Sequence, residues 1–201
     1  MIRIQAAAAT LSLLLLSVTA SADPWHKFRR QDAFWHHGSG FVFPRHVGQL
    51  ELIGTPAEID GNIDIIVEYA VKGSASLRAA TVGLYAPTSA APGAKLDTAR
   101  AALQAETDAK KCATSVSEKN FELTSQSGIA GTKIELAPKA GDGANCVASS
   151  LYFFQAAHWI ISVRTAATAM DSDAARVFDE FVRALRWETL DTDPLQSDLG
   201  A

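Results

Sequence analysis

Residues 146–165 read CVASSLYFFQAAHWIISVRT, and they contain the most apolar strands that the sequence predicts. Two near-continuous apolar runs, Cys146 to Gln155 and His158 to Thr165, are joined across Ala156 and Ala157. Such runs are typical of strands that are covered on both faces of a sheet. The sequence therefore predicts two neighbouring strands at the centre of the protein.

The flanking sequence predicts further antiparallel strands. Residues 63–71 show the clearest alternation, because Ile65, Val67 and Tyr69 share one face with the residues at both ends of the run. Turn residues such as Gly, Pro, Asn and Asp separate this strand from the others. The other predicted strands are residues 49–53, 79–85, 121–124 and 129–137.

Two segments carry helical periodicity. Residues 95–116 are rich in Ala and place Leu96, Ala99 and Leu103 near one stripe. A second helix is predicted from Asp171 or Ser172 to residue 187, with its apolar residues on one side. Strands and helices together predict an α+β fold, in which an antiparallel sheet of five to seven strands is flanked by two helices.

Residues 1–22 have the parts of a secretory signal peptide. Arg3 supplies a positive charge, residues 6–18 form an apolar region rich in Leu, and Ala20-Ser21-Ala22 is a small-residue cleavage site. The sequence thus predicts export to the periplasm or the medium, with an uncleaved anchor as the alternative. No later apolar stretch approaches the roughly 20 residues of a membrane helix, so no span is expected after cleavage.

The sequence is divided into four regions on these grounds. They are a signal peptide (1–22), an aromatic and His-rich N-terminal segment (23–48), a single α+β domain (49–188) and an acidic flexible tail (189–201). The chain has 18 Lys and Arg against 22 Asp and Glu, a formal net charge of −4. This balance argues against a generally basic surface that binds nucleic acid.

The chain has two cysteines, Cys112 and Cys146. Disulfides persist in oxidising compartments, so the even count and the signal peptide predict that the two are paired. Two buried thiols or a reactive pair are the alternatives. A redox catalyst more typically has the C-x-x-C spacing, which is absent here.

Histidines cluster in the N-terminal segment at positions 26, 36, 37 and 46. Neutral imidazoles suit Zn²⁺ or Cu²⁺, so His26, His36, His37 and His46 are candidate metal ligands, with Asp32 nearby. Their spacing matches no standard metal motif. The alternative interpretation is that they are polar groups of a docked or partner-facing segment, and no cofactor is then expected.

Trp25, Phe34 and Trp35 lie in the same segment and are candidates for contact with a partner, because aromatic residues are enriched at interfaces. Ordinary packing against the core is the alternative. The region after the signal peptide lacks the G-x-S-x-G and S-x-x-K motifs of common hydrolases.

Residues 38–48 read GSGFVFPRHVG, and they are followed by IIVEY at 65–69 and ATVGLY at 80–85. These segments resemble a group of uncharacterised exported bacterial proteins, a resemblance that implies an exported location. The order of hairpin, helix, meander and final helix resembles the PsbP-like sandwich.

These features favour an exported accessory or binding module that has no evident catalytic site and holds a protein or a small molecule. A metal-binding protein or metalloenzyme that uses the N-terminal histidines is one alternative. A structural envelope protein that associates with itself through the aromatic segment is another.

Overall fold

The computed structural model describes residues 25–28, 32–36, 38–59, 64–71, 78–85, 92–109, 114–123, 129–138, 147–156, 159–168 and 172–190. The strands in these ranges are β1 (Trp25–Phe28), β2 (Ala33–His36), β3 (Val42–Pro44), β4 (His46–Val47), β5 (Leu50–Ile59), β6 (Asp64–Val71), β7 (Arg78–Tyr85), β8 (Thr114–Glu122), β9 (Ala130–Pro138), β10 (Ala148–Ala156) and β11 (Trp159–Ala167). The helices are α1 (Pro92–Ala109), α2 (Ser172–Ala184) and the short 3₁₀-helix η1 (Trp187–Thr189).

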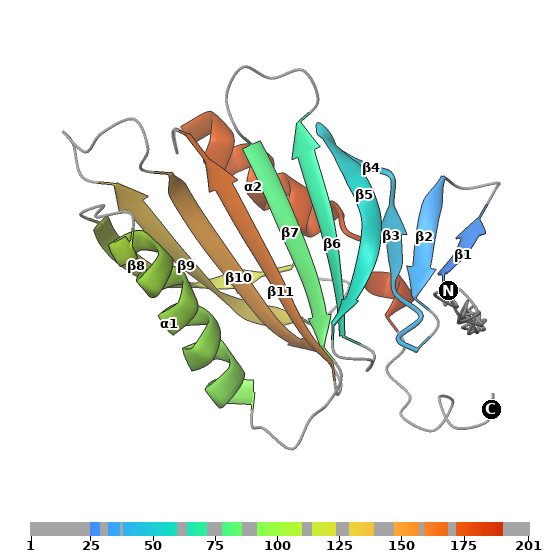
Figure 1. Ribbon diagram of the computed structural model, residues 1–201, viewed down its shortest axis with the longest axis horizontal. Coiled ribbons are helices and arrows are strands. Elements are labelled where there is room, and N and C mark those ends of the chain that lie inside the picture. The colour runs from blue at the N-terminus through green and yellow to red at the C-terminus, as the bar shows by residue number, and fades with distance from the viewer. Residues whose placement is uncertain are drawn as a thin grey trace, which may run out of the picture.

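The main sheet has eight strands in the order β4-β5-β6-β7-β11-β10-β9-β8, and every neighbouring pair is antiparallel. The chain builds it as two meanders, β4 to β7 and β8 to β11. The second meander runs back toward the first, so β11 pairs with β7 at the centre (Figure 1). The predicted central pair, β10 and β11, is thereby held between β9 and β7.

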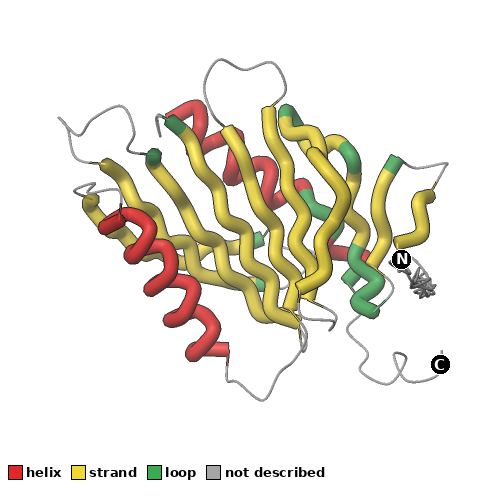
Figure 2. Tube along the Cα trace, in the orientation of Figure 1, coloured by secondary structure: helices red, strands yellow, loops and turns green. Residues whose placement is uncertain are grey.

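The two long helices, α1 and α2, lie on opposite faces of the main sheet, with the layer of strands between them (Figure 2). Alternation along the strands explains the arrangement, because Leu151 and Tyr152 point to opposite faces. Leu151 belongs to the apolar cluster under α1, whereas Tyr152 belongs to the larger core under α2. Neither helix is long and apolar enough to span a membrane, within the described ranges.

The larger core lies between α2 and the sheet. From α2 it takes Val177, Phe178 and Phe181, all of which are buried. The ring of Phe181 meets that of Tyr69 edge-on, with centroids 5.0 Å apart. Burial of side chains of this size stabilises a fold by roughly 1.5–3 kcal/mol each. Because the cluster of buried residues under α2 is the larger of the two, this face of the sheet carries most of the apolar packing.

A smaller sheet of three strands, β1-β2-β3, packs beside the main sheet. Phe43 of β3 and Phe41, which directly precedes this strand, are fully buried in the larger core. The backbone amide of Val42 donates to Thr189 Oγ1 at 2.9 Å, which connects this sheet to η1. Part of the N-terminal segment therefore contributes to the same core as the strands that follow.

The predicted sheet of five to seven strands is wrong, because the described residues form eleven strands, eight of them in the main sheet. The strands that were not predicted are β1 to β4, which have two to four residues each. Strands this short complete too few alternations to give a periodic signal. Their pairing partners, rather than their own sequences, determine them.

The first predicted helix ends too late. It was expected to reach residue 116, but α1 ends at Ala109 and β8 begins at Thr114. Val116 pairs with Leu136 of β9 and is exposed, so it does not continue the apolar stripe of the helix. β-branched residues at 114 and 116 favour a strand, and the Ala-rich run before them concealed the change.

Candidate functional site

Helix α1 presents two rows of side chains to the sheet. Leu96, Ala99 and Leu103, spaced three and four residues apart, pack on the cluster formed by residues 134, 136 and 151 of β9 and β10. The second row, Ala94, Thr98 and Ala102, is spaced by four residues and has small side chains. The large row anchors the helix, and the small row leaves space over β7 and β11.

This space is a cleft with a volume of about 420 Å³. The small row of α1 and Ala99 form the helical wall. The floor is formed by Tyr85 of β7, Phe153 of β10, and Ile160 and Ser162 of β11. Register explains the floor, because Tyr85 pairs with Ile160 and Ser162 pairs with Phe153, so all four side chains share one face of the sheet.

The lining is apolar except for three hydroxyl groups. Thr98 Oγ1 donates to the carbonyl oxygen of Ala94 at 2.8 Å, a bond to its own helix. Ser162 Oγ and Tyr85 Oη lie 3.5 Å apart on the floor. No charged side chain belongs to the described lining. A cleft of this kind suits a small molecule that is mostly apolar and is oriented by a few polar groups.

Gly83 makes the position of Tyr85 possible. A Cβ atom at residue 83 would lie 2.5 Å from Tyr85 Oη and 2.9 Å from Ser162 Oγ. These separations are shorter than real Cβ contacts, so the phenol ring folds back over a backbone position that only glycine leaves open. The sequence thereby places the Tyr85 hydroxyl beside Ser162.

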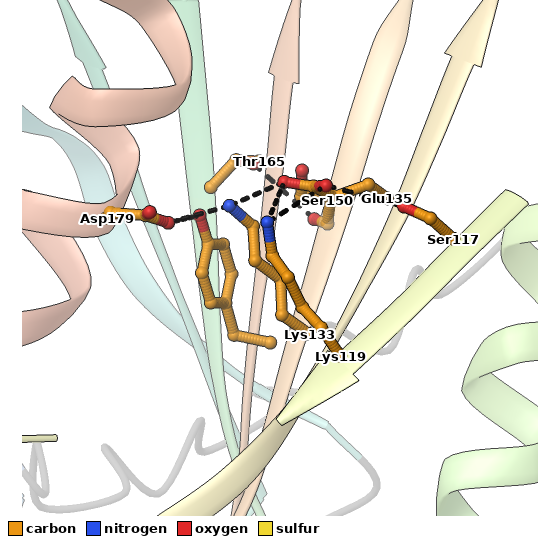
Figure 3. A network of polar contacts seen from close by, with 8 residues as sticks. Ser117, Lys119, Lys133, Glu135, Ser150, Thr165 and Asp179 are labelled. Atoms are coloured by element: carbon orange, nitrogen blue, oxygen red, sulfur yellow. Dashed lines mark hydrogen bonds and ion pairs between the residues drawn. The ribbon is translucent and has the colours of Figure 1, made fainter. Parts of the chain in front are cut away.

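A second polar cluster lies on the other face of the sheet, under α2 (Figure 3). Lys133 of β9 is almost fully buried, with its side chain 1% exposed. Its Nζ lies 2.7 Å from Asp179 Oδ1 of α2 and 2.7 Å from Glu135 Oε1. Tyr152 donates its hydroxyl proton to the same Asp179 oxygen at 2.7 Å. Lys119, on the outer strand β8, also contacts Glu135, with its Nζ 3.2 Å from Glu135 Oε2.

Charge balance gives this cluster a structural role. Two ammonium groups face two carboxylates, so the buried Lys133 is compensated by hydrogen bonds and by charge. Burial alone raises the pKa of Glu135, but Lys133, followed by Lys119, outweighs burial and holds this pKa below its ordinary value. Burial and then Asp179 raise the pKa of Tyr152. The cluster joins α2 to β9 and β10.

The candidate metal ligands take different places. His36 is buried in β2, where its Nδ1 lies 2.7 Å from Ser39 Oγ and its ring meets Trp159 edge-on. His46 is exposed on β4, beside Glu51 of β5. His26 lies on β1 opposite Trp35, but its side chain is outside the described part, as is the whole of His37. Among the described side chains, no three His, Cys, Asp or Glu gather as metal ligands.

The candidate contact aromatics fall in β1 and β2. Phe34 is half-buried and packs against the larger core. Trp35 is also half-buried, and it pairs with Val42 of β3. Trp25 pairs with His36 through the backbone, whereas its side chain lies outside the described residues. Phe34 thus packs on the core with one part of its side chain, and a partner role for Trp25, Phe34 and Trp35 stays a prediction.

Both cysteines lie outside the described residues, so their disulfide stays a prediction. Cys112 precedes β8 in the sequence and Cys146 precedes β10. Thr114 of β8 pairs with Pro138, and Ser149 of β10 pairs with Leu136, so both strands begin at the end of the sheet where β9 finishes.

No motif in the sequence indicated the cleft directly. Its four floor residues come from three strands, and only their register unites them. The small residues of α1, next to the row formed by Leu96, Ala99 and Leu103, were a local indication of open space beside the helix. They do not identify the strand residues that form the opposite wall of the cleft. Comparisons of the chain with protein-family models, curated proteins and solved structures find no match.

Proposed function

We propose that this protein is an exported binding module that holds a small, largely apolar molecule in the cleft between α1 and the main sheet. The cleft itself carries the proposal, because small side chains on α1 meet an aromatic and aliphatic floor and leave about 420 Å³ between them. Pockets that bind small molecules have this composition and reach this size. The export part rests on the signal peptide predicted at residues 1–22.

The volume indicates how large a molecule, or part of a molecule, the cleft holds. At roughly 30 Å³ for each water molecule in the liquid, the cleft has the space of about 14 waters. A ligand of about a dozen non-hydrogen atoms therefore fits. At about −0.5 kcal/mol for each atom, such a ligand would bind with a free energy of about −6 kcal/mol, a Kd of some tens of micromolar.

Methylnaphthalene is a suitable probe, because it is apolar and has the required size. We expect saturable binding at one site, measured by the change in its fluorescence. Ala102→Phe should abolish this binding, since a ring at residue 102 would occupy the cleft. Ala101→Phe is the matched control, because Ala101 is an exposed neighbour in α1 that does not line the cleft and should retain wild-type affinity.

Thermal unfolding of both variants shows whether they fold as the wild type does. If methylnaphthalene does not bind the wild type, or binds equally well to Ala102→Phe, the cleft is not a binding site for apolar molecules and the proposal fails.

A further inference from the structure

We infer that the cleft takes an unbranched alkyl chain of about ten carbon atoms, which lies extended along the side of α1. This inference rests on the proposed function and adds the chemical class of the ligand. Long-chain alcohols, fatty acids and lipids all carry such a chain. The basis is the length and the open form of the cleft, and no polar group of the lining is given a role.

The helical wall of the cleft is a straight row of small side chains. Ala94, Thr98 and Ala102 follow one another at intervals of four residues, and all three line the cleft. With a rise of about 1.5 Å for each residue, the row is about 12 Å long. α1 runs in nearly the same direction as β11 (Figure 1), so the wall follows the strand that carries Ile160 and Ser162 of the floor. The wall thus extends the cleft along the strand.

The cleft lies at a step between a helix and an uncovered part of the sheet. α1 packs on β9 and β10 through Leu96, Ala99 and Leu103, whereas α2 lies on the opposite face. Among the described helices, none therefore covers β5 and β6 on the side of the cleft. Dispersion attraction acts only at close contact, so a ligand gains most where it contacts wall and floor together. A narrow, linear molecule in this step contacts both along its whole length.

The length of the row determines the length of the chain. An extended polypeptide spans about 3.3–3.6 Å for each residue, which is three bonds, so an extended chain of single bonds spans about 1.2 Å for each bond. A wall of about 12 Å then corresponds to about ten bonds. The volume of about 420 Å³, which holds about a dozen non-hydrogen atoms, agrees with a chain of this length.

Straight-chain primary alcohols from butanol to dodecanol test the inference, with the Kd of each measured by NMR chemical-shift titration. The hydroxyl group is the same in all of them, so the trend reports the chain alone. We expect each added CH₂ to tighten binding by about two- to four-fold, the upper figure corresponding to complete burial. Beyond about ten carbon atoms the affinity should level off, because further carbons extend past the wall.

A variant that fills one end of the row tests the elongated shape. Leucine at residue 102 removes one helical turn of wall, about 6 Å or five bonds, and leaves the part between Ala94 and Thr98. In Ala102→Leu the affinity should therefore level off at about five carbon atoms, while butanol binds as it does to the wild type. Ala101→Leu is the matched control, because Ala101 is exposed and does not line the cleft, and it should behave as the wild type. Leucine favours helix, and circular dichroism of both variants verifies the fold.

Three results overturn the inference and leave the proposed function standing. The first is an affinity that does not rise with chain length, or that rises to dodecanol without levelling off. The second is a limit that stays at about ten carbon atoms in Ala102→Leu. The third is an equal loss for every alcohol in that variant, because the cleft is then a compact pocket. If neither the alcohols nor methylnaphthalene bind the wild type, the proposed function itself fails.

Decanoyl lysophosphatidylcholine distinguishes a lipid from a free chain, because it carries one ten-carbon chain on a phospholipid head group. Binding of this lipid that is weakened in Ala102→Leu and retained in Ala101→Leu supports a lipid chain as the ligand. Binding of decanol without binding of the lipid supports a free alcohol or acid.

Discussion

Replacing Lys133 by Met removes the buried ammonium of the cluster that joins α2 to the sheet. Methionine has a similar length and keeps the packing of the aliphatic stem. The change leaves Asp179 with the Tyr152 hydroxyl and leaves Glu135 with the exposed Lys119, so two carboxylates lose their closest cation. The fold should survive with a lower free energy of unfolding.

The size of the loss follows from burial. Removing one partner of a fully buried ion pair costs about 3–5 kcal/mol. Here the two carboxylate side chains are each 27% exposed, so water compensates for part of the loss. We expect Lys133→Met to lower the free energy of unfolding by about 2–3 kcal/mol and the Tm by about 5–10 °C.

Urea denaturation followed by circular dichroism measures this change. Lys119→Met is the matched control, because Lys119 is 52% exposed and reaches the same Glu135, so its loss should cost less than about 1 kcal/mol. In the double variant Lys133→Met/Asp179→Asn, the loss in the free energy of unfolding should be smaller than the sum of the losses in the two single variants, by at least about 1 kcal/mol. A Lys133→Met variant as stable as Lys119→Met would refute the structural role of the cluster.

Three further predictions concern stability and the disulfide. Burial, followed by Asp179, raises the pKa of Tyr152 in the folded protein. The protonated Tyr152 hydroxyl therefore contributes fully to the free energy of unfolding below the unfolded pKa of about 10, and this contribution is lost as the pH rises above that value. Urea midpoints should accordingly fall less above pH 10 in Tyr152→Phe than in the wild type. Gly131→Ala places a Cβ 2.4 Å from the Phe153 carbonyl oxygen and should cost about 1–3 kcal/mol, whereas Gly93→Ala, in open space on α1, should stabilise by up to about 1 kcal/mol in the same assay. Thiol titration of the denatured, unreduced protein from the exported fraction should find no free thiol, and two free thiols would exclude the pairing of Cys112 with Cys146.

Local periodicity identified β6, β10 and β11, whereas β5 was predicted only over residues 49–53 and β8 only over residues 121–124. The alternation in residues 63–71 corresponds to β6, and the apolar runs around residues 146–165 correspond to β10 and β11. Leu96 and Leu103 of the predicted helix do pack against the sheet. These segments complete several periods, so their own residues determine what they become.

The short strands and the cleft depend on distant parts of the chain. β3 is a strand because β2 pairs with it and because Val42 bonds to Thr189, which is 147 positions away. The floor of the cleft likewise needs Tyr85 beside Ile160. No local pattern contains such pairings, whereas the histidines at 26, 36, 37 and 46 are conspicuous in the sequence itself. Of these, the two with described side chains, His36 and His46, lie on different strands, β2 and β4.

Intermolecular NOEs between methylnaphthalene and the protein show where the bound probe lies. We expect the ring protons of the bound probe to contact Phe153 and the methyl groups of Ile160, and these contacts to disappear in Ala102→Phe. NOEs at saturation to the exposed Ile53 of β5, with none to Phe153 or Ile160, would contradict the claim that the cleft under α1 is the binding site.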